Sequence, residues 1–80
     1  MIKLTKITKN NDTISCMAFV EDCKEYIKLV YNIKSGEFDE YAFPKNYEYC
    51  TSHIAYARNY FDKIISSKKA LPNEKLIMWY

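Results

Sequence analysis

Residues 13–20 alternate strictly between two sets of side chains, and this period of two constrains the fold more than any other feature of the sequence. The set that would face a core comprises Ile14, Cys16, Ala18 and Val20. Such alternation is typical of a β-strand with one buried face. Residues 2–8 alternate less regularly. Asn10-Asn11-Asp12, between the two segments, favours a turn because Asx side chains bond to their own backbone.

A third alternating segment follows a polar break at residues 21–24. Its predicted core face carries Ile27, Leu29, Tyr31 and Ile33. The stretch Lys34-Ser-Gly-Glu37 contains the sole glycine, Gly36, where a hairpin loop needs a positive φ. A fourth strand is predicted from Glu37 to Phe43, because Pro44 ends it. Residues 1–43 therefore predict an antiparallel β-meander.

After the loop at residues 45–50, the spacing of the apolar residues changes from the period of two of a strand to that of a helix. Apolar side chains recur at spacings of three and four, at Ile54, Ala57, Phe61, Ile64 and Ile65. This pattern predicts a helix of about four turns, with Thr51 or Ser52 as its N-cap and Lys68-Lys69 near its negative C-terminal end. Residues 75–80 are expected to form a final strand or an extended tail. The predicted fold is one small α+β domain, residues 1–80, with a meander of about four strands, one covering helix and a short C-terminal strand (ββββαβ).

A single helix covers only one face of a sheet, so the other face is left to water or to a partner. The alternation places five large side chains there: Met17, Phe19, Tyr26, Val30 and Tyr41. A chain of this size buries only about 60–65% of the surface that its unfolded form exposes. Burial by a second chain, including a second copy in a homodimer, is therefore an open alternative.

The charge balance argues against non-specific duplex binding. Twelve Lys and Arg against ten Asp and Glu give a net charge of +2, whereas affinity built on many phosphate contacts needs a strongly basic chain. Arg58 is the sole arginine, and arginine is the preferred residue for bidentate phosphate or base recognition. The three cysteines show no repeating spacing and no secretory signal is evident, which favours a reducing cytoplasm. No apolar run approaches the roughly 20 residues that span a bilayer.

Two patterns suggest chemistry, and each has a plainer interpretation. Cys50-Thr-Ser-His53 has a zinc-ligand spacing, with Cys23 as a third candidate, but only one ligand pair is visible. The same Cys50 with His53 as base would make a nucleophile at a helix start, yet no oxyanion loop accompanies it. The acidic clusters, Glu37, Asp39 and Glu40, and Glu21, Asp22 and Glu25, are interpreted as solvated hairpin ends. We expect no catalytic residue, metal site or cofactor.

The tyrosines are the strongest anomaly of the sequence. Five of the eight lie between residues 41 and 60, and tyrosine is enriched at interfaces because it offers a large area and a polar tip. Tyr47, Tyr49 and Tyr56 are the least easily buried, and we predict that they anchor a partner. Lys45 and Arg58 would supply the orienting charge.

Three stretches carry a resemblance to known proteins: Ile2 to Ser15, the turn at residues 34–37 and the ending Leu71 to Tyr80. They look like small proteins of phages and mobile elements of AT-rich Gram-positive bacteria. That resemblance implies an inhibitor of host machinery, including anti-CRISPR and other anti-defence proteins, and it carries no catalytic motif. No functional residue is carried over from it.

Two functions of different classes follow. The leading hypothesis is a non-enzymatic phage-type protein that inhibits a host defence or replication factor in the host cytoplasm by protein–protein binding. The alternative is a nucleotide or single-stranded nucleic-acid binding module that uses tyrosines for stacking and lysines for phosphates, including an oligomeric sponge for a cyclic nucleotide signal. A hydrolase built on Cys50 and His53 comes third.

Overall fold

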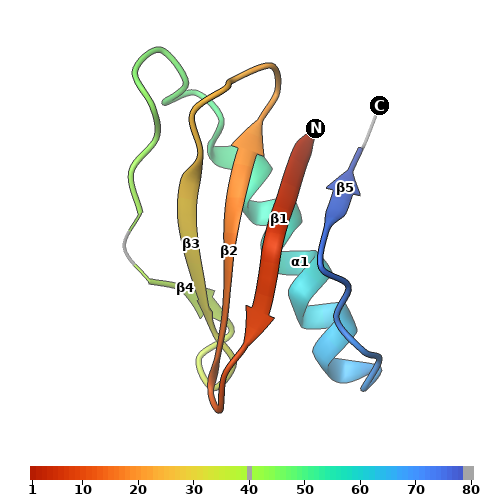
Figure 1. The fold of residues 1–80 in the computed structure, drawn as a ribbon. Helices are drawn as coiled ribbons and strands as arrows, with labels where there is room; N and C mark the ends of the chain where they lie inside the picture. The colour runs from red at the N-terminus through yellow and green to blue at the C-terminus, as the bar shows by residue number, and fades with distance from the viewer. Residues whose placement is uncertain (40, 79–80) are drawn as a thin grey trace.

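Five strands form one antiparallel sheet with one helix across a face of it, in a computed structural model that describes residues 1–39 and 41–78 (Figure 1). The elements in chain order are β1 (Ile2–Lys9), β2 (Thr13–Val20), β3 (Ile27–Asn32), β4 (Glu37–Phe38), α1 (Thr51–Ser66) and β5 (Lys75–Ile77). The strand order across the sheet is β4-β3-β2-β1-β5. The predicted α+β fold, with its meander, covering helix and C-terminal strand, is confirmed.

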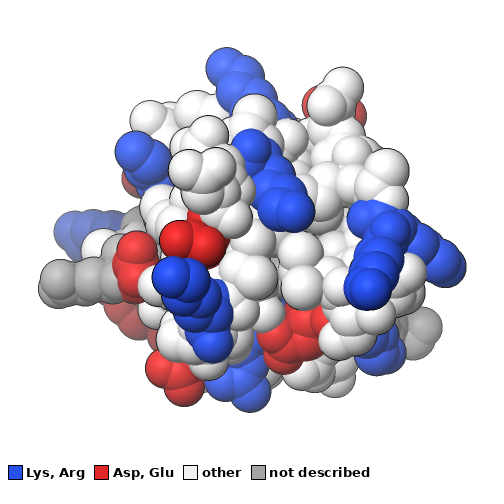
Figure 2. Space-filling model, turned by 90° about the horizontal axis from the view of Figure 1, so that it is seen from below, with Lys and Arg blue, Asp and Glu red and all other residues white. Residues whose placement is uncertain are grey.

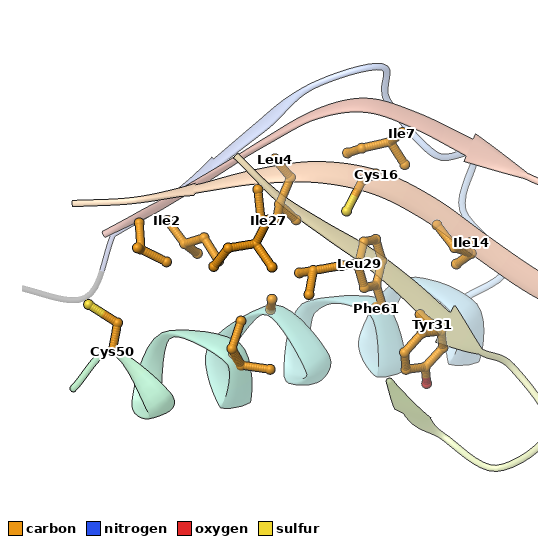
Figure 3. Close-up of a cluster of buried hydrophobic side chains, with 14 of the residues drawn as sticks. Ile2, Leu4, Ile7, Ile14, Cys16, Ile27, Leu29, Tyr31, Cys50 and Phe61 are labelled. Atoms are coloured by element: carbon orange, nitrogen blue, oxygen red, sulfur yellow. The ribbon is translucent and has the colours of Figure 1, made fainter. Parts of the chain in front are cut away.

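The core lies between the sheet and α1. Figure 3 shows Ile2, Leu4, Ile27 and Leu29 on the strands above the helix, with Phe61 from α1 among them. Phe61 has no exposed surface, and its ring centroid lies 5.4 Å from that of Tyr31. In β2 the alternation is confirmed, since Ile14, Cys16, Ala18 and Val20 are all buried.

β1 contains a β-bulge, which explains why its apolar and polar residues do not alternate regularly. Ile2 and Leu4 are buried, so regular alternation would turn Lys6 toward the core and Ile7 away from it. Instead the pairing with β2 shifts between Thr5 and Thr8, and Lys6 adopts a left-handed backbone with φ of 51°. This extra residue keeps Lys6 exposed and returns Ile7 to the core.

The fourth strand is much shorter than the predicted Glu37–Phe43. Only Glu37–Phe38 pairs with β3, although the Asp39 N–H still donates to the Val30 carbonyl at 2.9 Å. Tyr41, predicted on the uncovered face, packs against the core and beside α1 instead. Its ring makes edge contacts with Phe38 and Phe43. Edge-on contacts of this kind between aromatic rings are favourable and stabilise Tyr41 on the helix side. Glu40 lies outside the described residues.

Both ends of α1 differ from the prediction. The N-cap is Cys50 rather than Thr51 or Ser52, because the chain enters the helix from a turn in which the Cys50 N–H donates to the Tyr47 carbonyl at 3.0 Å. The helix ends at Ser66, so Lys68 follows the helix instead of continuing its periodic face, because Lys68 adopts a left-handed backbone with φ of 58°. The N–H groups of Lys68 and Lys69 then donate to the carbonyls of Ile65 and Ile64, which is the Schellman pattern.

β5 lies at the margin of the sheet, where Lys75–Ile77 pairs with Ile2–Leu4 of β1. The last two residues of the predicted strand, 79 and 80, lie outside the described residues. Across the sheet, the Tyr31 hydroxyl donates a hydrogen bond to Asp62 of α1, which fastens the helix to β3. Gly36 has a φ of 71°, which is the positive φ that the hairpin prediction required. It lies beside the Tyr31–Asp62 pair. In the described part of the chain no helix has the length and apolarity to cross a membrane.

Candidate partner-binding surface

The face of the sheet opposite α1 carries a group of apolar side chains near the end of β2, formed by Phe19, Tyr26 and Leu76. Phe19 of β2 contacts Tyr26 edge-on, with ring centroids 6.4 Å apart, and Tyr26 is 53% exposed. The sheet register places Lys3 between Phe19 and Leu76, which is 48% exposed. Lys3, Phe19 and Leu76 line a hollow of about 530 Å³. Its charged and polar lining includes Glu21, Asp22, Cys23 and Lys24 of the connection after β2.

The loop before α1 holds two tyrosines against the same connection. The rings of Tyr47 and Tyr49 stack with centroids 6.2 Å apart and an interplanar angle of 23°. The Tyr47 hydroxyl donates to Asp22 at 2.9 Å, and this bond is the main cause that raises the pKa of Tyr47 to about 12. Tyr49 is 69% exposed. Tyr47 is thus a fixed support on which the exposed Tyr49 ring rests.

The hollow over Phe19 continues around the connection after β2. A second hollow of about 330 Å³ lies beside Lys45 and Tyr47, and Asp22, Cys23 and Lys24 line both hollows. We call the combined area the turn-end surface. It consists of residues 21–26, residues 44–50 and the side chains of Lys3, Phe19 and Leu76. In Figure 1 both connections lie at the same end of the sheet as the N-terminus.

A cluster of polar contacts around Glu21 fastens the turn-end surface to the helix. Glu21 has a left-handed backbone, with φ of 49°, and its Oε1 lies 2.6 Å from Nε2 of His53. The Met1 amino group donates to the same oxygen at 2.9 Å. His53 is buried in the first turn of α1, with 7% of its surface exposed. The contacts of Glu21 with Met1 and His53 hold this left-handed residue in place, and they fix the connection in one arrangement.

The predicted anchors do not form one site. Lys45, Tyr47 and Tyr49 lie together on the turn-end surface. Tyr56 faces the groove between α1 and β5, whereas Arg58 lines a hollow on the other side of the helix with Glu37 and Phe38. A separation of two residues places side chains on nearly opposite sides of a helix. Tyr56 and Arg58 therefore cannot both belong to one small contact patch with the loop.

Cys50 does not have the setting of a nucleophile. Its side chain is fully buried, and that burial is the main cause that raises the pKa of its thiol. A nucleophilic cysteine needs a lowered pKa and access to substrate. The Nε2 atom of His53 is engaged by Glu21. Within residues 1–39 and 41–78, no three His, Cys, Asp or Glu side chains come together in a group able to hold a metal ion.

Two features of the surface were not predicted from the sequence. The Glu21–His53 contact joins side chains 32 positions apart, for which no local pattern exists. Leu76 joins Phe19 only because β5 pairs with β1, and the sequence left the position of that strand open. Phe19 and Tyr26 were placed on the uncovered face by alternation, and the structure confirms that placement.

Comparisons with known proteins add no further indication of function. Family models, curated proteins and solved structures were each searched with this chain, and none of the three gave a match.

Proposed function

We propose that this protein is a non-enzymatic interaction module that inhibits a host defence or replication factor by binding it through the turn-end surface. The observation that carries the proposal is the exposure of Tyr26, Tyr49 and Leu76 on a surface whose larger hollow is lined by the charged side chains of Glu21, Asp22 and Lys24. Aromatic anchors inside a polar rim are typical of protein-binding hot spots. The phage-type setting comes from the resemblance of the sequence alone.

The rigidity of the surface supports the same proposal. Tyr49 rests on Tyr47, which is held by Asp22, and Glu21 is held by His53. Loops that are ordered before binding lose less conformational entropy when a partner docks. The surface therefore offers its exposed rings in a fixed arrangement, as a tight inhibitor requires.

The alternative, a nucleotide or single-stranded nucleic-acid binder, draws its support from the stacked pair Tyr47 and Tyr49. The charge around that pair opposes it, because Asp22 and Glu25 line the hollow beside Tyr47 together with Lys24 and Lys45. Phosphates need a net positive neighbourhood. The geometry therefore favours a protein partner at this surface.

The test is quantitative affinity capture from a lysate of an AT-rich Gram-positive bacterium, with a tag on a long C-terminal linker. Truncating a true anchor costs about 2 kcal/mol or more, so a partner should be retained by the wild type and lost by the Tyr26→Ala, Tyr49→Ala double variant. Lys9→Ala is the control, since Lys9 is exposed at the end of β1 and lines neither hollow of the turn-end surface. Equal retention by the double variant would refute the assignment. Co-purified nucleic acid, released by salt, would favour the alternative.

A further inference from the structure

We infer that the groove between α1 and β5 is a second binding surface, and that it takes an acidic, partly apolar segment of a protein. This inference goes beyond the proposed function, because the groove lies apart from the turn-end surface except for Leu76. Two adjoining hollows of about 260 and 350 Å³ form it, and Tyr60 and Lys63 line both. We call this area the α1–β5 groove.

The charges of the groove are mainly positive. Lys63 and Lys69 from the helix end and Lys75 from β5 line it. Glu74 is the acidic neighbour of Lys75 in the sequence, while Asp62, next to Lys63, accepts the Tyr31 hydrogen bond away from the groove. Figure 2, which views the molecule from below, shows basic side chains at the right edge, with acidic side chains also in view nearer the middle and at the upper right. An anionic occupant is therefore favoured.

The apolar lining of the groove favours an acidic peptide over a nucleic acid as the anionic ligand. Leu76 and Met78 are 48% and 61% exposed, and Ile64 and Ile77 line the two hollows. Such side chains match the apolar residues of a peptide, whereas the sugar-phosphate backbone of a nucleic acid offers them little. The two hollows are at or below the roughly 300–1,000 Å³ of small-molecule pockets, and they suit single side chains of a bound segment.

The aromatic ring in the groove also argues against nucleic acid. Nζ of Lys75 lies over the Tyr60 ring, 5.7 Å from its centroid. This cation covers one of the two faces of the Tyr60 ring, so that face is not open to a stacking base. The cations of the groove are all lysines, and they lack the bidentate geometry with which arginine reads phosphates and bases. An acidic protein segment satisfies both the lysines and the apolar hollows.

The probe is a fluorescent peptide of about twelve residues in which Glu alternates with Leu, a pattern that sends charges and apolar groups to opposite sides of an extended chain. Fluorescence anisotropy should show binding, and the Lys63→Glu, Lys75→Glu double variant should weaken it by at least about tenfold. The control is the Lys9→Glu, Lys28→Glu double variant, which makes the same change of net charge at exposed positions outside both the groove and the turn-end surface. Circular dichroism and thermal melts establish that all variants fold.

Each outcome bears on the inference. Loss of peptide binding in the groove variant alone supports it, and a Ser-for-Leu peptide should then bind at least about tenfold more weakly. Equal losses in the control variant overturn it, because binding is then a property of net charge. Tighter binding of a single-stranded oligonucleotide, lost in the groove variant, also overturns it in favour of nucleic acid. The result is independent of capture by the turn-end surface, because Tyr26 and Tyr49 lie outside the groove.

Discussion

Replacement of Tyr31 by phenylalanine should measure how strongly the sheet holds the helix. Tyr31 is buried in β3, with 2% exposed, and its hydroxyl donates to Asp62 of α1. A hydrogen bond to a charged group contributes about 1.5–3 kcal/mol. Asp62 is half-exposed, so water replaces the hydroxyl in the variant, and phenylalanine leaves no buried polar atom behind. We therefore expect a loss near the lower limit, about 1.5 kcal/mol.

Urea unfolding of the wild type and of Tyr31→Phe at neutral pH measures this loss. For a domain of 60–100 residues, 1.5 kcal/mol corresponds to a decrease in Tm of about 6–12 °C. The Asp62→Asn variant and the double variant complete a cycle that isolates the energy of the pair. A Tyr31→Phe protein within about 0.5 kcal/mol of the wild type would refute the view that this bond fastens the helix.

The pH dependence gives an independent check on Tyr31. Burial first, and the Asp62 bond second, raise the pKa of Tyr31 from 10.0 to about 12. The phenol therefore ionises more readily in the unfolded chain, so its stabilising contribution is complete below pH 10 and is lost as the pH rises toward 12. The difference in stability between the wild type and Tyr31→Phe isolates the contribution of this one side chain, and that difference should narrow between pH 10 and 12.

Two further predictions concern the helix end and the thiols. Lys68→Gly should stabilise the protein by about 0.5–1 kcal/mol in urea unfolding, because glycine adopts a positive φ without strain; Lys69→Gly, at an ordinary φ, should not. Cys16 and Cys50 should react slowly with iodoacetamide in the folded protein, since burial raises the pKa of Cys16 to about 12 and also raises that of Cys50. All three cysteines should react in denaturant. Rapid labelling of Cys50 in the native state would revive the hydrolase hypothesis.

The meander and the helix could be predicted because their signals are local. The period of two in residues 13–20 and the spacings of three and four after residue 51 depend on neighbours a few positions apart. The ends of elements depend on tertiary contacts instead. Tyr41 lies outside the expected fourth strand, where its ring contacts Phe38 and Phe43 on the helix side. No pattern in residues 37–43 indicates this placement.

The candidate site was predictable only where the residues lie close in sequence. Lys45, Tyr47 and Tyr49 share one loop and do lie together. Tyr56 and Arg58 were selected for exposure and charge, although helix geometry alone separates two residues at this spacing by about 200°. The Glu21–His53 contact requires the folded arrangement of β2 and α1, so the sequence contains no indication of it.

The bulge at Lys6 also bears on how related chains can vary in length. Two residues of β1, Lys6 and Ile7, stand opposite one residue of β2, so removal of Lys6 leaves strictly alternating residues with Ile2, Leu4 and Ile7 inward. The pairing from Thr8 onward is then unchanged. A deletion elsewhere in the regular part of β1 would invert inward and outward residues instead. Among descendants of one ancestral gene, this strand can therefore lose a codon at one place while the core keeps its composition.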